Sequence, residues 1–364
     1  MSTACTSFGP ASERIRLWCL MIAFAMAVVP FGLAGCGATG GGASGQTTAA
    51  GPRIITDGAG RQVEVPADVR RVITVGSVPV LNSFPFAVGM GDRIVNGMPP
   101  NNVDGYQSYK TLAPQLLTNP VVQTAIGNDV NPEKVLELRP DVVLTSNKDV
   151  AEELQSLGVP SVVLSLETGE NIKKSVQVTG DVFGVPDRAD AYVAYFDEMV
   201  NRVERIAVTI PEADKPSVLY IDTRPLRRPN LVMEWMLNRV GVESVTKDIT
   251  IGQYQFSAEQ LLAWNPELLI GMRPYDRDDL FGDSRFASVQ AVKNRALTIV
   301  PTGIQIWGNN TAEQPLALAW VATQVFPGHY ADIDMPAETK RFYSEFFRID
   351  LTDRQVADLL AARL

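Results

Sequence analysis

Short apolar runs alternate with amphipathic segments along most of this chain of 364 residues. Six runs rich in Val, Ile and Leu have the length of buried strands, and they span residues 72–75, 142–145, 162–166, 218–221, 268–271 and 297–300. The segments between them carry apolar residues at the three- and four-residue spacing that indicates helices. This alternation predicts an α/β fold in which mainly parallel sheets are flanked by helices.

The longest uninterrupted helix pattern covers residues 187–207 and lies between Pro186 and Pro211. It divides the globular sequence into two portions of similar length, 53–186 and 208–364. We interpret it as a helix that connects an N-terminal lobe to a C-terminal lobe. The alternative is that it is one more crossover helix within a sheet layer.

The chain also contains an internal repeat. Residues 131–144 align without gaps with residues 257–270, so that Glu259 lies 126 positions after Glu133. In each copy an Asn or Ser can cap a short helix, a glutamate falls in the first turn, and a proline stops the helix before a strand. Each lobe is therefore expected to present one glutamate at an equivalent exposed corner. Taken singly, either carboxylate would be ordinary helix-start chemistry worth about 0.3–1 kcal/mol.

The amino terminus has the pattern of an exported lipoprotein. Arg14 and Arg16 precede an apolar run over residues 17–34, and the sequence Leu-Ala-Gly-Cys that ends at Cys36 has the form of a lipobox. Residues 1–35 then form a signal peptide, and residues 36–52 form a lipidated cysteine followed by a flexible Gly/Ala/Thr/Ser tether. The alternative is a plain membrane anchor with a chance cysteine.

Composition excludes several classes of function. The net charge of −9 argues against non-specific nucleic-acid binding, and the single His329 excludes His-rich metal sites. Two of the three cysteines, Cys5 and Cys19, fall in the signal peptide, so the mature chain has no intrachain disulfide. The motifs GxSxG, HExxH, CxxC and the P-loop are absent. We therefore expect no enzyme, no resident cofactor and no directly ligated metal ion, although carboxylate-only chemistry stays open as an alternative.

Several motifs occur together in a specific order: the lipobox, the tether, an opening ITDGAGR at residues 55–61, and two E-x-V/L-L-x-x-x-P-D/E units. Over residues 53–364 the chain resembles the substrate-binding lipoproteins of ATP-driven importers for iron-siderophore complexes and cobalamin, which form the rigid-helix class III of periplasmic binding proteins. The resemblance implies two lobes, each with a central mainly parallel sheet, joined by one long helix, with a ligand cleft between them.

The same resemblance implies partners and a location. The partners are an ABC permease dimer with its cytoplasmic ATPase, and by motif position Glu133 and Glu259 would dock onto that permease. Two carboxylates held far apart on a rigid body would select one orientation on a two-fold partner. The protein would lie outside the cytoplasm, anchored to the membrane by a lipid on Cys36, and we expect a monomer.

Ligands of α/β sheets collect at the loops beyond the carboxyl ends of the strands. These loops contain cations that suit an anionic ligand and aromatic side chains that could face a large flat one. The candidate cleft residues are Lys148, Arg224, Arg273, Tyr275, Trp307, Tyr106 and Tyr109. For Trp307 the alternative is packing beneath a helix, and for Arg227 and Arg228 the alternative is a solvated loop.

The cargo expected from these residues is an iron(III)-siderophore or a similar metal chelate, because a chelated metal brings its own ligands. Cobalamin or haem is the alternative within the same importer class. From other classes, an exported lipoprotein enzyme using carboxylates and a ligand sensor remain open.

Overall fold

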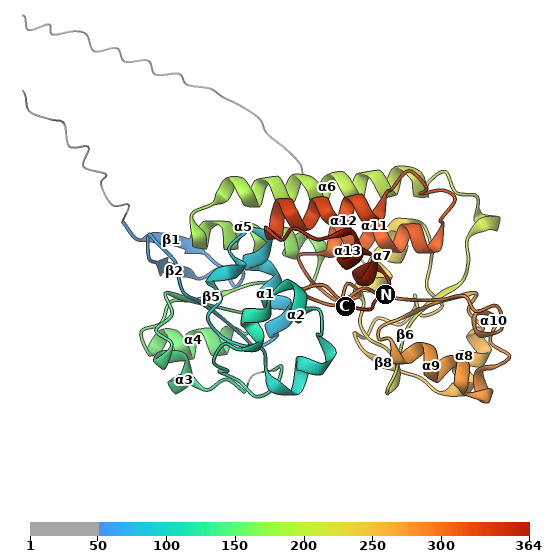
Figure 1. Cartoon of the computed structure of the whole chain (residues 1–364), viewed down its shortest axis with the longest axis horizontal. Coiled ribbons are helices and arrows are strands. Elements are labelled where there is room, and N and C mark those ends of the chain that lie inside the picture. Colours follow the sequence, from blue (N-terminus) through green and yellow to red (C-terminus); the bar gives the residue numbers. More distant parts are fainter. Residues whose placement is uncertain (1–50, 128) are drawn as a thin grey trace, which may run out of the picture. The chain divides into compact units, whose positions relative to one another are not determined.

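In the computed structural model, which describes residues 51–127 and 129–364, three parallel strands form the sheet of the N-terminal lobe (Figure 1). Their order is β3-β4-β5, and Val72 lies beside Val142 in the register. The strands are β3 (Val72–Val75), β4 (Val142–Thr145) and β5 (Ser161–Val163), and a hairpin of β1 (Arg53–Thr56) and β2 (Gln62–Val65) precedes them. The predicted strands at 72–75 and 142–145 are confirmed to the residue.

Among the described residues, five α-helices belong to this lobe. They are α1 (Val78–Ala87), α2 (Tyr109–Leu112), α3 (Pro132–Glu137), α4 (Lys148–Ser156) and α5 (Gly169–Phe183). Helix α1 begins three residues after the end of β3, in a stretch beyond the carboxyl end of a strand where the topology rule alone would place a ligand-facing loop. Its buried apolar side chains explain the difference, because they pack in the main core.

The C-terminal lobe has a five-stranded sheet in the order β10-β9-β6-β7-β8. Strands β6 (Val218–Thr223), β9 (Leu268–Gly271) and β10 (Leu297–Ile299) are parallel, whereas β7 (Leu226–Arg228) and β8 (Tyr254–Gln255) are antiparallel additions at one edge. The helices are α7 (Val232–Val240), α8 (Ala258–Trp264), α9 (Tyr275–Gly282) and α10 (Gln290–Lys293). The parallel part β6-β9-β10 thus repeats the order β3-β4-β5 of the first lobe.

Helix α6 (Pro186–Ala207) connects the lobes over 22 residues, as the pattern at 187–207 predicted. Pro186 stands in its first turn, where a missing N–H has no cost. Figure 1 shows α6 running along one edge of both lobes, with α11 (Gln314–Val325) and α12 (Met335–Phe342) beside it and α13 (Asp353–Leu360) below them. None of the helices described is long and apolar enough to cross a membrane.

Alternate residues of β6 face opposite layers, as the two-residue period of a strand requires. Leu219 and Ile221 pack in a small outer core, together with Leu261 of α8. Val218 and Tyr220 point the other way, into the main core. The side chain of Tyr220 therefore points towards the segment that follows β10.

The predicted signal peptide, the lipobox with Cys36, and the tether up to residue 50 lie outside the described residues.

Candidate functional site

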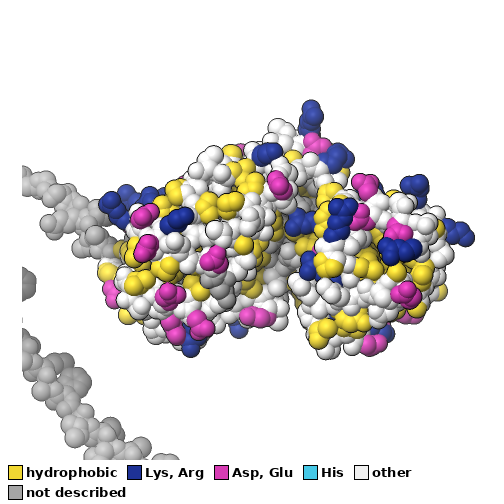
Figure 2. Space-filling model, turned by 90° about the horizontal axis from the view of Figure 1, so that it is seen from below, with side chains coloured by type: hydrophobic (Ala, Val, Ile, Leu, Met, Phe, Trp, Pro, Cys, Tyr) yellow, Lys and Arg dark blue, Asp and Glu magenta, His cyan; other side chains and the backbone are white. Residues whose placement is uncertain are grey.

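The two lobes meet where the segment that contains Gly105 and Tyr106 contacts the loops that follow β9 and β10. The Nη1 of Arg273 donates a hydrogen bond to the carbonyl oxygen of Gly105 over 2.7 Å, and the Tyr106 hydroxyl donates to Oε1 of Gln305 over 2.7 Å. Figure 2 shows a furrow between the lobes, with Lys and Arg side chains along the border that belongs to the C-terminal lobe. We refer to this region as the lobe junction.

Arg273 has the least compensated charge at the lobe junction. It is half-buried, its guanidinium carbon lies 5.5 Å from the centre of the Tyr106 ring, and no carboxylate in the described part of the chain forms an ion pair with it. Its backbone N–H donates to Oδ2 of Asp276 over 2.8 Å, which fixes the start of the side chain. A guanidinium has five donors, so most of them are free to bind an anion here.

A charged network occupies the carboxyl end of β6. Arg224 forms two hydrogen bonds with Asp279, one of them 2.6 Å long between Nε and Oδ2, and its guanidinium carbon lies 4.6 Å from the centre of the Tyr275 ring. The Tyr275 hydroxyl donates to Oδ1 of Asp222 over 2.8 Å. Burial raises the pKa of Tyr275, and the hydrogen bond from Arg224 lowers the pKa of Asp279. The structure thus brings the two candidates Arg224 and Tyr275 together, but Asp279 already neutralises the Arg224 charge.

The structure corrects the expectation for three of the aromatic candidates. Trp307 is fully buried, and its Nε1 donates to Oε1 of Glu313 over 3.0 Å. Tyr109 is also fully buried, and its hydroxyl accepts from Nδ2 of Asn82 over 3.1 Å. Tyr106 is 3% exposed and lies at the lobe junction with its ring covered by Arg273. These rings pack in the core and therefore offer no open surface to a flat ligand. Each ring also carries a polar group, and that group has a buried hydrogen-bond partner.

The remaining cations have structural partners. Lys148, the first residue of α4, is exposed and pairs with Glu152 one turn later, 3.5 Å away. Arg227 pairs with the buried Asp222 over 2.8 Å. Arg228 has no exposed surface and pairs with Glu234 over 3.2 Å, so its role is structural and the solvated-loop alternative is wrong for it.

Glu313 is a buried residue that the sequence analysis did not identify. Its carboxylate accepts hydrogen bonds from the backbone N–H of Gln305 over 2.8 Å, from Trp307 and from the Tyr343 hydroxyl. Burial raises the pKa of Glu313. It holds in place the loop that supplies Gln305 to the lobe junction. In the sequence, its only signal is an acidic residue directly before the apolar helix α11, which predicts a helix start and nothing more.

Glu133 and Glu259 are both exposed in the first turns of α3 and α8, as the repeat predicted. The Asn131 side chain caps α3, and Ser257 caps α8 in a reciprocal capping box. A hydrogen bond from Ser257 lowers the pKa of Glu259. Figure 1 places α3 and α8 on different lobes, at the edge away from α6.

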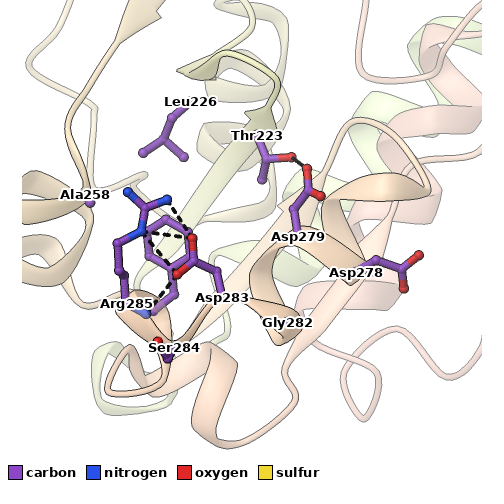
Figure 3. A pocket seen from close by; sticks show the side chains of 10 residues that line it. Thr223, Leu226, Ala258, Asp278, Asp279, Gly282, Asp283, Ser284 and Arg285 are labelled. Carbon is purple, nitrogen blue, oxygen red and sulfur yellow. Dashed lines mark hydrogen bonds and ion pairs between the residues drawn. The ribbon is translucent and has the colours of Figure 1, made fainter.

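A separate surface pocket lies beside α8 and α9 in the C-terminal lobe (Figure 3). Its charges already pair with each other, since Arg285 contacts Asp283 over 2.6 Å and Asp279 accepts from the Thr223 hydroxyl over 2.7 Å. Within residues 51–127 and 129–364, no group of three or more His, Cys, Asp or Glu side chains is arranged to hold a metal ion.

Comparisons with known proteins agree on one family. Residues 87–302 match the family model described as "Periplasmic binding protein". The molybdate-binding protein MolA of Haemophilus influenzae is 24% identical over 329 residues, which cover 81% of this chain and 91% of that protein. The iron(3+)-hydroxamate-binding protein YxeB of Bacillus subtilis is 26% identical over 98 residues, 27% of this chain and 30% of that protein. A solved periplasmic solute binding protein from Veillonella parvula superposes with a TM-score of 0.75 at 27% identity, covering 85% of this chain and 97% of that one.

Proposed function

Because this chain belongs to the periplasmic binding protein family and is a substrate-binding protein of a class III ABC importer, we propose that its cargo is a small oxyanion of the molybdate type, held at the lobe junction by Arg273. Such proteins act outside the cytoplasm and pass their substrate to a permease that an ATPase drives. Membership confirms the predicted family, the predicted two-lobed α/β fold and the prediction that the chain is not an enzyme.

The uncompensated guanidinium of Arg273 carries the oxyanion proposal. A planar guanidinium matches the oxygen spacing of an oxyanion with two parallel hydrogen bonds. The buried Trp307 and Tyr109 further support a small cargo, since they leave no flat aromatic wall for a large chelate. The relative that binds molybdate is similar over most of both chains, which supports the same choice.

Isothermal titration with molybdate, sulfate and phosphate tests this proposal. Arg273→Ala should weaken binding of the preferred oxyanion about 10- to 100-fold, because hydrogen bonds to a charged group contribute about 1.5–3 kcal/mol. Arg277→Ala is the matched control, since Arg277 is an exposed arginine of α9 only four residues away, and its affinity should equal that of the wild type. If no oxyanion binds, or if both variants bind equally well, the proposal is wrong.

An iron(III)-siderophore, the cargo predicted from the sequence, is the second candidate. The observation that favours it is the pair of Arg224 and Tyr275, in which a cation with a 59% exposed side chain lies over an aromatic ring. Quenching of tryptophan fluorescence by a ferric hydroxamate or catecholate, with no heat from molybdate, would establish this cargo instead. Haem and cobalamin belong in the same titration as the remaining candidates of this importer class.

The lipid anchor, the docking glutamates and the monomeric state belong to the same proposal. Lipidation of Cys36 would keep the protein at the membrane, and Cys36→Ala should release it to the soluble fraction. The exposed positions of Glu133 and Glu259 on separate lobes support docking onto a permease dimer. Light scattering of the purified chain should give the mass of one copy.

A further inference from the structure

Tyr220 of β6 has an unusual environment for its hydroxyl. The side chain is fully buried, yet the hydroxyl has no hydrogen-bond partner among the described residues. Burying a hydroxyl without a partner is unfavourable, because its bonds to water are lost and not replaced. Most other tyrosines of the main core avoid this, as the Tyr192 hydroxyl does by donating to the Ala312 carbonyl over 2.7 Å.

The surroundings of this hydroxyl connect it to the lobe junction. A Cβ atom on Gly308 would lie only 2.1 Å from the Tyr220 oxygen, so a residue without a side chain leaves the hydroxyl its space. Gly308 directly follows Trp307, in the loop that Glu313 holds. The charged side chains that act on the pKa of Tyr220 are Arg273, Asp276 and Asp222.

The protonation state of Tyr220 makes it a donor. Burial raises the pKa of the Tyr220 hydroxyl, and the positive charge of Arg273 only partly offsets this. The group therefore stays protonated at neutral pH and can donate one hydrogen bond. Beside the donors of Arg273, an oxyanion is the kind of ligand that accepts it.

We infer that the Tyr220 hydroxyl donates a hydrogen bond to the oxyanion bound by Arg273, which would make Tyr220 a ligand-binding residue of the inner wall of the site. This inference rests on the proposed function. It gives the buried hydroxyl of Tyr220 a hydrogen-bond partner, which the other described residues do not provide.

Tyr220→Phe tests the inference, since it removes one oxygen atom and keeps the ring. With sodium molybdate as the probe, the Kd should rise about 10-fold or more through loss of a charge-assisted hydrogen bond. In the absence of molybdate the melting temperature should rise, because the unpaired hydroxyl is gone. A tyrosine that does not contact the ligand would leave the Kd unchanged.

Tyr195→Phe is the matched control. Tyr195 also buries its hydroxyl, but it lies on α6 with its ring against Phe342 and Phe346. Its Kd for molybdate should equal that of the wild type. Gly308→Ala is a second, independent variant that forces the Tyr220 ring to move, and it should also raise the Kd.

The outcomes separate this inference from the proposed function. A wild type that binds no molybdate overturns both. A wild type that binds molybdate with an Arg273-dependent Kd, beside a Tyr220→Phe variant with the same Kd, overturns only the role of Tyr220. A weaker Kd together with a higher ligand-free melting temperature supports it.

Discussion

The two lobes share a strand order but differ in the chemistry at the carboxyl ends of their first strands. In the N-terminal lobe, neutral side chains form the buried network at β3. Asn96 exchanges hydrogen bonds with the backbone of Thr74 at 2.9 Å in each direction, and the Thr74 hydroxyl donates to Asn82 over 2.6 Å. Gln123 bonds the backbone of Gly76 in the same reciprocal way.

In the C-terminal lobe the corresponding place at β6 is charged. Asp276 is buried and accepts from the backbone and the hydroxyl of Thr223 over 2.8 and 2.7 Å, while Asp222 pairs with Arg227. The strands β7 and β8, which bring in Arg227, have no counterpart in the first lobe. The comparison teaches that the repeat supplies the scaffold twice, whereas, among the described residues, buried charged side chains lie at the end of the first parallel strand in the C-terminal lobe only.

The largest expected effect concerns the exposed glutamate that the repeat places on each lobe. Replacing Glu133 and Glu259 together by Ala should abolish transport and leave ligand affinity unchanged, because both carboxylates face outwards. The measurement is uptake by cells carrying the cognate permease, alongside titration of the purified variant. Each single variant should lose transport to a similar degree if the lobes dock equivalently, and an equal loss of ligand binding in the double variant would refute the docking role.

The next largest effect is a loss of stability on substitution of core residues that occupy the same position of the repeat in the two sheets. Leu144 of β4 and Ile270 of β9 have no exposed surface and lie 126 positions apart in matching strands. Substitution of either by Ala should lower the free energy of unfolding by about 2–5 kcal/mol, measured by urea denaturation. A loss below about 1 kcal/mol in one lobe alone would show that the two sheets are not equally packed.

The neutral and charged networks should differ in their pH dependence. Burial raises the pKa of Asp276 above its ordinary value of 3.8, so the stability that it contributes is present below that value and is lost as the pH rises through the raised pKa. The free energy of unfolding of the wild type relative to Asp276→Asn should therefore fall as the pH rises. Asn96→Ala should cost about 1–3 kcal/mol at every pH, because the groups bonded to Asn96 do not titrate. Urea denaturation of the wild type, Asp276→Asn and Asn96→Ala between about pH 4 and pH 8 checks both predictions. A cost of Asn96→Ala that varies with pH would contradict the proposed difference between the neutral and the charged network.

The smallest effect concerns the caps of the repeated helices. Asn131→Ala and Ser257→Ala should each cost about 0.5–2 kcal/mol. The two losses should be similar, because each variant loses one bond from a backbone N–H, that of Lys134 over 3.0 Å or that of Gln260 over 3.3 Å. The return bond from the Ser257 N–H to Oε1 of Gln260 involves the backbone and stays in Ser257→Ala. Thermal unfolding of both variants measures the two losses, and clearly unequal values would count against equivalent caps in the two lobes.

Much of the fold could be predicted from the sequence, because the elements depend on nearby residues. The strands at 72–75, 142–145 and 268–271 are short apolar runs whose burial is visible in their composition. Helix α6 begins at a proline and carries an apolar stripe of helical spacing. The prediction was less accurate for β5, which ends at Val163 rather than at residue 166.

The candidate site could be predicted only in part. Arg273 was identified because it follows a strand of a parallel sheet, which is a rule of topology. Nothing in the sequence separated it from Arg224, whose charge is neutralised by Asp279 in the fold.

The sequence by itself thus determined the two lobes, the connecting helix and the repeated glutamates, since local periodicity and caps specify them. Only the tertiary structure decided which polar groups are satisfied. Tyr106 meets Gln305 across 199 positions of the chain, and Arg273 meets Gly105 across 168. Contacts over such separations depend on how the lobes pack together, which is why the buried state of Trp307 and the unpaired hydroxyl of Tyr220 emerged only from the fold.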